Sequence, residues 1–164
     1  MYVDYYRFTE PPFNVTPDPK FLYMTEQHTT ALNHLLFGVR QRKGFILLTG
    51  EIGAGKTTLC RRLLETLGAG YHTALVLNPM LTPTQLLRAI VEEFGIENRC
   101  RDRLGFIRLL NEFLLSANSA GRDAVLIIDE SQDMSVELLE AVRLLSNLET
   151  DTHKLLQIVL VGQP

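Results

Sequence analysis

Glycine, lysine and threonine recur at a fixed spacing in one short stretch of this chain. The stretch consists of Gly50, Glu51, Ile52, Gly53, Ala54, Gly55, Lys56, Thr57 and Thr58. Glycines can adopt backbone angles that turn successive N–H groups toward one point, where the positive end of the following helix also favours an anion. The spacing is that of a phosphate-binding loop, so we expect residues 50–58 to bind a nucleotide.

The residues around the loop support this interpretation. The apolar run 45–48 before it is typical of a buried parallel strand, and residues 56–64 after it are typical of a helix. Lys56 is expected to reach the β and γ phosphates as a point charge, and the Thr57 hydroxyl is expected to take one coordination site on Mg²⁺. The competing interpretation is a glycine-rich turn without a function.

Two adjacent carboxylates follow another apolar run. Residues 124–128 are typical of a buried strand, and Asp129 and Glu130 come directly after it. Ligands of open α/β sheets bind at the carboxyl ends of the strands. Asp129 is expected to hold Mg²⁺ through its water shell, opposite Thr57, and Glu130 is expected to orient a water for attack on the γ-phosphate. A solvated acidic strand end is the alternative for this pair.

Polar residues also end two other predicted strands. Gln163 ends the fourth apolar run of the chain, and Asn78 ends the second. Both are candidates for sensing the γ-phosphate. The ordinary alternatives are a turn residue for Gln163 and an Asn-Pro turn initiator for Asn78.

The remaining apolar segments alternate between helical and strand periodicity. Thr25 and Asp102 are placed to cap helices, and Thr82 joins a capping box to Pro83 at the first helical position. Predicted helices include residues 25–42, 82–95, 102–120 and 138–148, and predicted strands cover residues 73–77, 124–128 and 155–161. Because strands alternate with helices, we expect an α/β fold with a mainly parallel sheet covered on both faces.

The composition suits one folded domain. The chain has 164 residues, of which 46% are apolar, and a net charge of −3. That charge provides no broad basic field, so binding to nucleic acid would need a local basic patch. Cys60 and Cys100 lack metal-ligand spacing and are expected to be reduced thiols. The chain also lacks an export signal and any apolar run long enough to span a membrane, so we expect a soluble, cytoplasmic protein.

Several longer stretches resemble the AAA+ ATPases of the general secretion pathway protein A (ExeA) type, which have relatives among type IV pilus and transposition ATPases. The resemblance spans nearly the whole chain. It rests on residues 12–23, on His28 with Ala31 and Leu32, and on residues 44–58, 129–132, 143–150 and 155–164. The proline-rich stretch 12–23 and the stretch 143–150 are far more specific than the phosphate-binding loop alone.

The resemblance implies a P-loop NTPase of the AAA+/ASCE type, folded as a three-layer αβα sandwich. Residues 1–24 would form an aromatic, proline-rich segment that packs near the nucleotide and folds over the adenine. Residues 25–164 would form the ATPase core. The resemblance also implies that Gln163 is the sensor-1 residue and that Asn78 restrains Glu130 as a glutamate switch.

The resemblance further implies an ATPase that uses ATP and Mg²⁺, works as a homo-oligomer and serves assembly in a secretion or pilus system. Full-length proteins of this type add a membrane segment, so an anchor in the inner membrane is expected outside this chain. Ser131 stands where the family usually has alanine, a change not expected to disturb Asp129 or Glu130. Since the chain stops at Pro164, before a fifth strand and a helical lid, we expect a truncated core that hydrolyses ATP slowly.

Alternatives stay open at this point. The chain could be a nucleotide-gated DNA-binding regulator of the transposition ATPase type, a small-molecule kinase, or a domain that binds ATP only to become ordered. Arg143 is either an arginine finger or a surface residue of an amphipathic helix. We also expect the fourth strand to lie centrally, next to the first strand, which leaves the other side of the first strand as a free edge.

Overall fold

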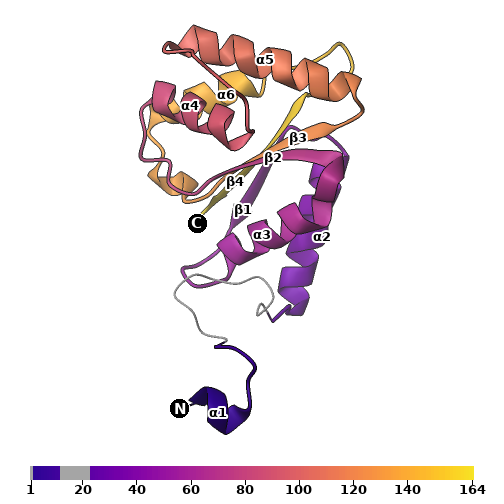
Figure 1. The fold of residues 1–164 in the computed structure, drawn as a ribbon, viewed down its shortest axis with the longest axis vertical. Helices are drawn as coiled ribbons and strands as arrows, with labels where there is room; N and C mark the ends of the chain where they lie inside the picture. Colours follow the sequence, from indigo (N-terminus) through magenta and orange to yellow (C-terminus); the bar gives the residue numbers. More distant parts are fainter. Residues whose placement is uncertain (1, 12–22) are drawn as a thin grey trace.

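A parallel four-stranded sheet forms the centre of the computed structural model, which describes residues 2–11 and 23–164 (Figure 1). The strands follow the order β1-β4-β3-β2. Their bounds are Phe45–Thr49 for β1, Tyr71–Val76 for β2, Asp123–Ile128 for β3 and Leu156–Gly162 for β4. All three neighbouring pairs are parallel. The predicted α/β fold and the central place of the fourth strand beside the first are confirmed.

Helices cover both faces of this sheet (Figure 1). One face carries α2 (Glu26–Arg40) and α3 (Lys56–Leu67), and the other carries α4 (Pro83–Glu93), α5 (Arg103–Ser119) and α6 (Val136–Leu145). The two helical layers and the sheet between them form a three-layer αβα sandwich, as expected.

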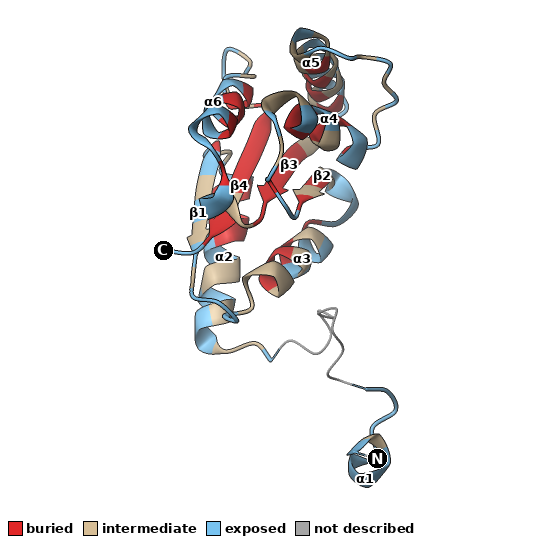
Figure 2. Ribbon diagram, turned by 90° about the vertical axis from the view of Figure 1, so that its left-hand side faces the viewer, coloured by how far each residue is buried: buried red, intermediate tan, exposed pale blue. Residues whose placement is uncertain are grey.

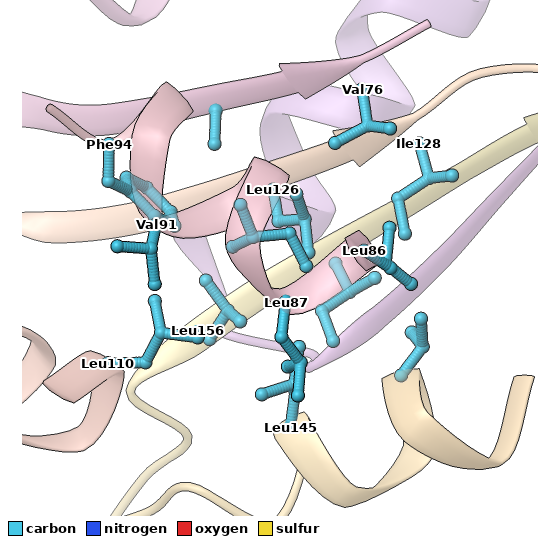
Figure 3. Packing of buried hydrophobic residues seen from close by; sticks show 14 of the residues in the cluster. Val76, Leu86, Leu87, Val91, Phe94, Leu110, Leu126, Ile128, Leu145 and Leu156 are labelled. Atoms are coloured by element: carbon cyan, nitrogen blue, oxygen red, sulfur yellow. The ribbon is translucent and has the colours of Figure 1, made fainter. Parts of the chain in front are cut away.

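Alternation along β3 divides the core into two clusters. Leu126 and Ile128 join the cluster under α4, α5 and α6, whereas Val125 and Ile127 join the cluster under α2 and α3. Figure 2 shows β3 and β4 as buried strands, and Figure 3 shows leucines of α4, α5 and α6 meeting the first of these faces. Each fully buried aliphatic side chain contributes about 1.5–3 kcal/mol through the hydrophobic effect. Burial of β3 and β4 therefore holds their carboxyl ends, where the site lies, in fixed positions.

The first strand differs from the prediction of a buried run. Phe45 is 43% exposed and Leu47 is 69% exposed, and neither belongs to a core cluster. Ile46 and Leu48 are partly buried against the cluster under α2 and α3. The reason is position: within the described residues β1 pairs only with β4, so it is an edge strand whose second face lacks a helix.

Helix ends follow the predicted local signals. Thr25 caps α2 by accepting a hydrogen bond from the backbone N–H of His28, and Thr82 and Gln85 form a capping box at α4. Asp102 precedes α5 but makes no side-chain capping hydrogen bond. Helix α2 ends at Arg40, before the predicted end at residue 42. Arg42 has a left-handed backbone (φ 51°), which does not fit into a right-handed helix.

The N-terminal residues form a short helix, α1 (Tyr2–Tyr6), which Figure 1 shows apart from the sandwich. Tyr6 stacks on Phe8 and meets Tyr5 edge to face, and all three rings remain exposed. Residues 12–22, on which most of the predicted adenine-covering segment falls, lie outside the described residues. The division of the chain at residue 24 therefore stays a prediction. Among the residues that the structure describes, no helix combines the length and apolarity needed to cross a membrane.

Candidate functional site

The carboxyl ends of β1, β3 and β4 bring most of the predicted residues, but not Asn78, together around one cavity or directly beside it. The cavity has a volume of about 420 Å³ and is lined by Ile52, Gly53, Gly55, Lys56, Thr57, Thr58, Glu130 and Gln163. These residues come from three segments that are distant in sequence. A larger cavity of about 580 Å³ lies against α4 and α5 and contains none of the predicted site residues.

The loop after β1 has the backbone that the glycine pattern predicts. Gly53 and Gly55 have φ angles of 77° and 81°, in the left-handed region that glycine adopts without a steric cost. A Cβ added at Gly53 would touch nothing, so the left-handed backbone alone explains why glycine occupies this position. Gly55 is also the N-cap of α3, whose first amides have no partner within the helix. Among the described residues, the N–H groups of Gly53 and Gly55 have no backbone acceptor, so the loop offers donors beside the cavity.

Lys56 lies across the loop. Its Nζ donates hydrogen bonds to the carbonyl oxygens of Gly50 and Glu51, at 2.8 and 2.9 Å. Phosphate oxygens are stronger acceptors for an ammonium than neutral carbonyls, because the hydrogen bond is then between two charged groups. The side chain is therefore placed to exchange these two carbonyls for a bound phosphate.

Thr57 and Asp129 meet although 72 residues separate them. The Thr57 hydroxyl donates to Oδ2 of Asp129 at 2.5 Å, and Oδ1 of Asp129 accepts the backbone N–H of Glu130 at 2.9 Å. Asp129 is only 2% exposed. A hydroxyl and a carboxylate side by side are hard oxygen ligands, the type that Mg²⁺ prefers. This donor set fits the predicted metal.

Glu130 turns away from Asp129 because its backbone is left-handed, with φ 52° and ψ 38°. Such angles are uncommon for residues other than glycine and occur frequently at functional sites. The turn places Glu130 on the wall of the cavity that the phosphate loop also lines. The two adjacent carboxylates therefore have separate positions, one beside Thr57 and one at the cavity.

Gln132 is a site residue for which the sequence predicts no role. Its Nε2 donates to Oε2 of Glu130 at 2.6 Å, and its Oε1 accepts the backbone N–H of Gln163 at 3.1 Å. A Cβ at Gly162 would lie 2.8 Å from the same Oε1, so a larger residue there would displace the Gln132 amide. The amide links the ends of β3 and β4. Its position two residues after the acidic pair is the available sequence signal.

The two candidate phosphate sensors have different surroundings. Gln163 lines the cavity with Lys56 and Glu130. Asn78 is exposed, and its Oδ1 accepts the backbone N–H of Met80 at 3.0 Å, which is the turn role that an Asn-Pro pair favours. No hydrogen bond between Asn78 and Glu130 occurs among the described residues. The restraint of Glu130 by Asn78 stays a prediction.

Arg143 points to a partner on its own helix. Its guanidinium donates to both carboxylate oxygens of Glu140, at 2.8 and 2.7 Å, and both side chains are more than half exposed. The hydrogen bonds from Arg143 are the main reason why the pKa of Glu140 is lowered. This geometry matches the surface interpretation of Arg143.

Cys60 lies fully buried on α3, beneath the site. Burial raises the pKa of its thiol from 9.0 to about 12, with a further contribution from the charge of Asp129 and an opposing one from Lys56. At pH 8 the group is therefore a neutral thiol, and the thiolate is the reactive form. We expect a thiol reagent to modify the half-buried Cys100 in the native protein and to modify Cys60 only after unfolding. Mass spectrometry of labelled peptides checks this, and equal native rates for both cysteines would contradict it.

Residues 39–164 match the sequence model of a family described as AAA domain. The chain belongs to this AAA family. It is also 46% identical, over its whole length, to General secretion pathway protein A of Aeromonas hydrophila, and it spans 30% of the length of that relative. The resemblance to AAA+ ATPases of this type is confirmed.

Solved structures with the same fold include two archaeal proteins. Cdc6p from Pyrobaculum aerophilum aligns with a TM-score of 0.67 and 18% identity, over 87% of this chain and 40% of that one. The Aeropyrum pernix ORC2 protein, solved in ADPNP-ADP complexes, aligns with a TM-score of 0.61 and 18% identity, over 84% of this chain and 40% of that one. At this identity the likeness identifies the fold, which is the P-loop NTPase fold of AAA+ proteins.

Proposed function

We propose that this AAA domain binds ATP with Mg²⁺ at residues 50–58 and hydrolyses it. The observation that carries the proposal is the hydrogen bond between Thr57 of the phosphate loop and Asp129 at the end of β3. It joins the phosphate-binding loop to the acidic end of β3, the two parts that an NTP-hydrolysing site requires. The ORC2 protein of the same fold was solved with ADPNP and ADP, which supports a nucleotide as the ligand.

In this proposal each residue has one task. The amides of Gly53 and Gly55 and the ammonium of Lys56 hold the phosphates, and Glu130 accepts a proton from the attacking water or orients it. Gln163 contacts the γ-phosphate from the end of β4. Mg²⁺, held by Thr57 and Asp129, would offset negative charge on the phosphate oxygens.

The biological setting is also a proposal, since the relative named for general secretion is much longer than this chain. We propose an ATPase that works in the cytoplasm as an oligomer and serves assembly or remodelling in a secretion or pilus system, with the full-length protein anchored to the inner membrane. An arginine from a neighbouring subunit contributes about 10³ to 10⁵ in rate in related NTPases. The chain alone is therefore expected to be slow.

A second candidate is a nucleotide-gated DNA-binding regulator. Arg88, Arg99 and Arg101 line the larger cavity at α4 and α5, where Arg88 is paired with Glu92, and they are the candidate phosphate contacts for such binding. Duplex DNA titrated at rising salt separates the two candidates, because phosphate contacts weaken steeply with ionic strength.

The test of the proposed function is a calorimetric titration of the chain with ATP, in the presence and absence of Mg²⁺. We expect saturable binding that Mg²⁺ strengthens, and we expect Asp129→Asn to remove most of the strengthening, because it removes one anionic oxygen ligand. Asp151→Asn, in an exposed loop, makes the same charge change and serves as the control. Absence of ATP binding with and without Mg²⁺ would refute the proposal.

A further inference from the structure

His28 is a residue outside the phosphate loop that contacts it directly. It lies in the first turn of α2, and its Nε2 is 3.0 Å from the carbonyl oxygen of Ala54. On the other side of the ring, Nδ1 is 2.8 Å from the hydroxyl of Thr25. The ring therefore bridges the start of α2 and the loop, across 26 residues of sequence.

The hydrogen-bond partners define the tautomer of this ring. A carbonyl oxygen only accepts, so Nε2 must carry the proton that it donates to Ala54. The Thr25 hydroxyl accepts the backbone N–H of His28 at 3.2 Å and is free to donate its own proton to Nδ1. With a proton on Nε2 both ring nitrogens have a hydrogen-bond partner, so the ring is held at both ends.

The position of the Ala54 carbonyl determines the direction of the next amide. The carbonyl of Ala54 and the N–H of Gly55 belong to one planar trans peptide unit, in which the two groups point in opposite directions. With the carbonyl held toward α2, the N–H of Gly55 points the other way, and Gly55 lines the phosphate cavity. Within residues 2–11 and 23–164 no acceptor is recorded for this N–H.

We propose that His28 is a positioning residue of the phosphate site, which holds the 54–55 peptide so that the Gly55 N–H donates to a bound phosphate. This inference rests on the proposed nucleotide binding. Gly55 has a left-handed φ of 81°, and glycine tolerates many backbone angles, so this peptide is free to rotate once its carbonyl is released. Rotation would turn a carbonyl oxygen toward the phosphate and remove one donor. Losing one hydrogen bond to a charged group weakens binding by roughly tenfold or more.

Two amide substitutions test the hydrogen bonds of the two ring nitrogens separately. In His28→Gln the side-chain amide nitrogen reaches approximately the place of Nε2 and can still donate to Ala54. In His28→Asn the shorter amide reaches only the place of Nδ1. It can therefore keep the hydrogen bond to Thr25 but loses the one to the Ala54 carbonyl. We expect His28→Gln to bind ATP within about threefold of the wild type, and His28→Asn and His28→Ala to bind it roughly tenfold more weakly.

The experiment measures ATP affinity by calorimetry and folding by thermal melting for all three variants. His34→Gln is the matched control, because His34 is an exposed histidine of the same helix. Adenosine, which has no phosphate, is expected to bind all variants equally. If His28→Ala does not fold, the comparison of the Gln and Asn variants still decides the question.

The outcomes are distinct. Wild-type binding with a loss in the Asn variant but not in the Gln variant supports the role of His28. Equal affinities for the wild type and both amide variants, or equal losses in both, would overturn it while leaving nucleotide binding intact. A wild-type chain that does not bind ATP would overturn the proposed function and, with it, this inference.

Discussion

Replacement of Glu130 by glutamine is expected to lower the rate of ATP hydrolysis by about 10² to 10⁴, because a positioned base contributes that much. ATP affinity should change little, since the carboxylate contacts the water rather than the nucleotide in the proposed mechanism. The glutamine also keeps an oxygen that can accept the hydrogen bond from Nε2 of Gln132. Hydrolysis is measured with radiolabelled ATP in a single turnover with the protein in excess, which detects the slow rate expected of this chain.

Glu137→Gln is the control for this result. Glu137 lies exposed in the first turn of α6, so its substitution makes the same chemical change away from the cavity. A Glu130→Gln variant that hydrolyses ATP as fast as the Glu137→Gln variant would exclude Glu130 as the base.

Replacement of Lys56 by alanine is expected to weaken ATP binding on the order of 10²-fold, because an ammonium that donates to charged phosphates contributes about 1.5–3 kcal/mol per hydrogen bond. ATP should lose more affinity than AMP, which has neither a β nor a γ phosphate. Competition against a fluorescent nucleotide measures each affinity.

Lys43→Ala provides the matched control. Lys43 is exposed and lies just before β1, at the opposite end of the strand from the loop, so the variant has the same net charge without the local change. A similar loss in both variants would attribute the effect to overall charge and would contradict the proposed contact.

The phosphate loop was predictable because its signals are local. Gly53 and Gly55 have left-handed backbone angles, which glycine adopts without a steric cost, and their spacing before Lys56 marks the loop in the sequence. The exposure of Leu47 was not predictable in this way, since an apolar run has the same pattern in a central strand and at an edge. Whether a strand is covered depends on helices that lie far away in sequence.

The roles of His28 and Gln132 could not be predicted from the sequence for a related reason. Each acts through hydrogen bonds to groups 26 and 31 residues away, and no spacing rule connects those positions. Asn78 shows the opposite case, because the local rule for an Asn-Pro turn describes its observed hydrogen bond to Met80. Local chemistry thus predicted the loop, while tertiary contacts decided which side chains support it.

The pairing of β1 with β4 has a consequence for synthesis of the protein on the ribosome. The register joins Phe45 to Ile158 and Thr49 to Gly162, so the strand that carries the phosphate loop finds its partner only after residues 156–162 have been translated. Closing so long a segment is entropically costly and slow. A nascent chain that ends before residue 156 has every loop residue, but β1 then lacks the strand that joins it to β3 and β2. Cellular ATP would therefore stabilise only chains in which translation has passed β4.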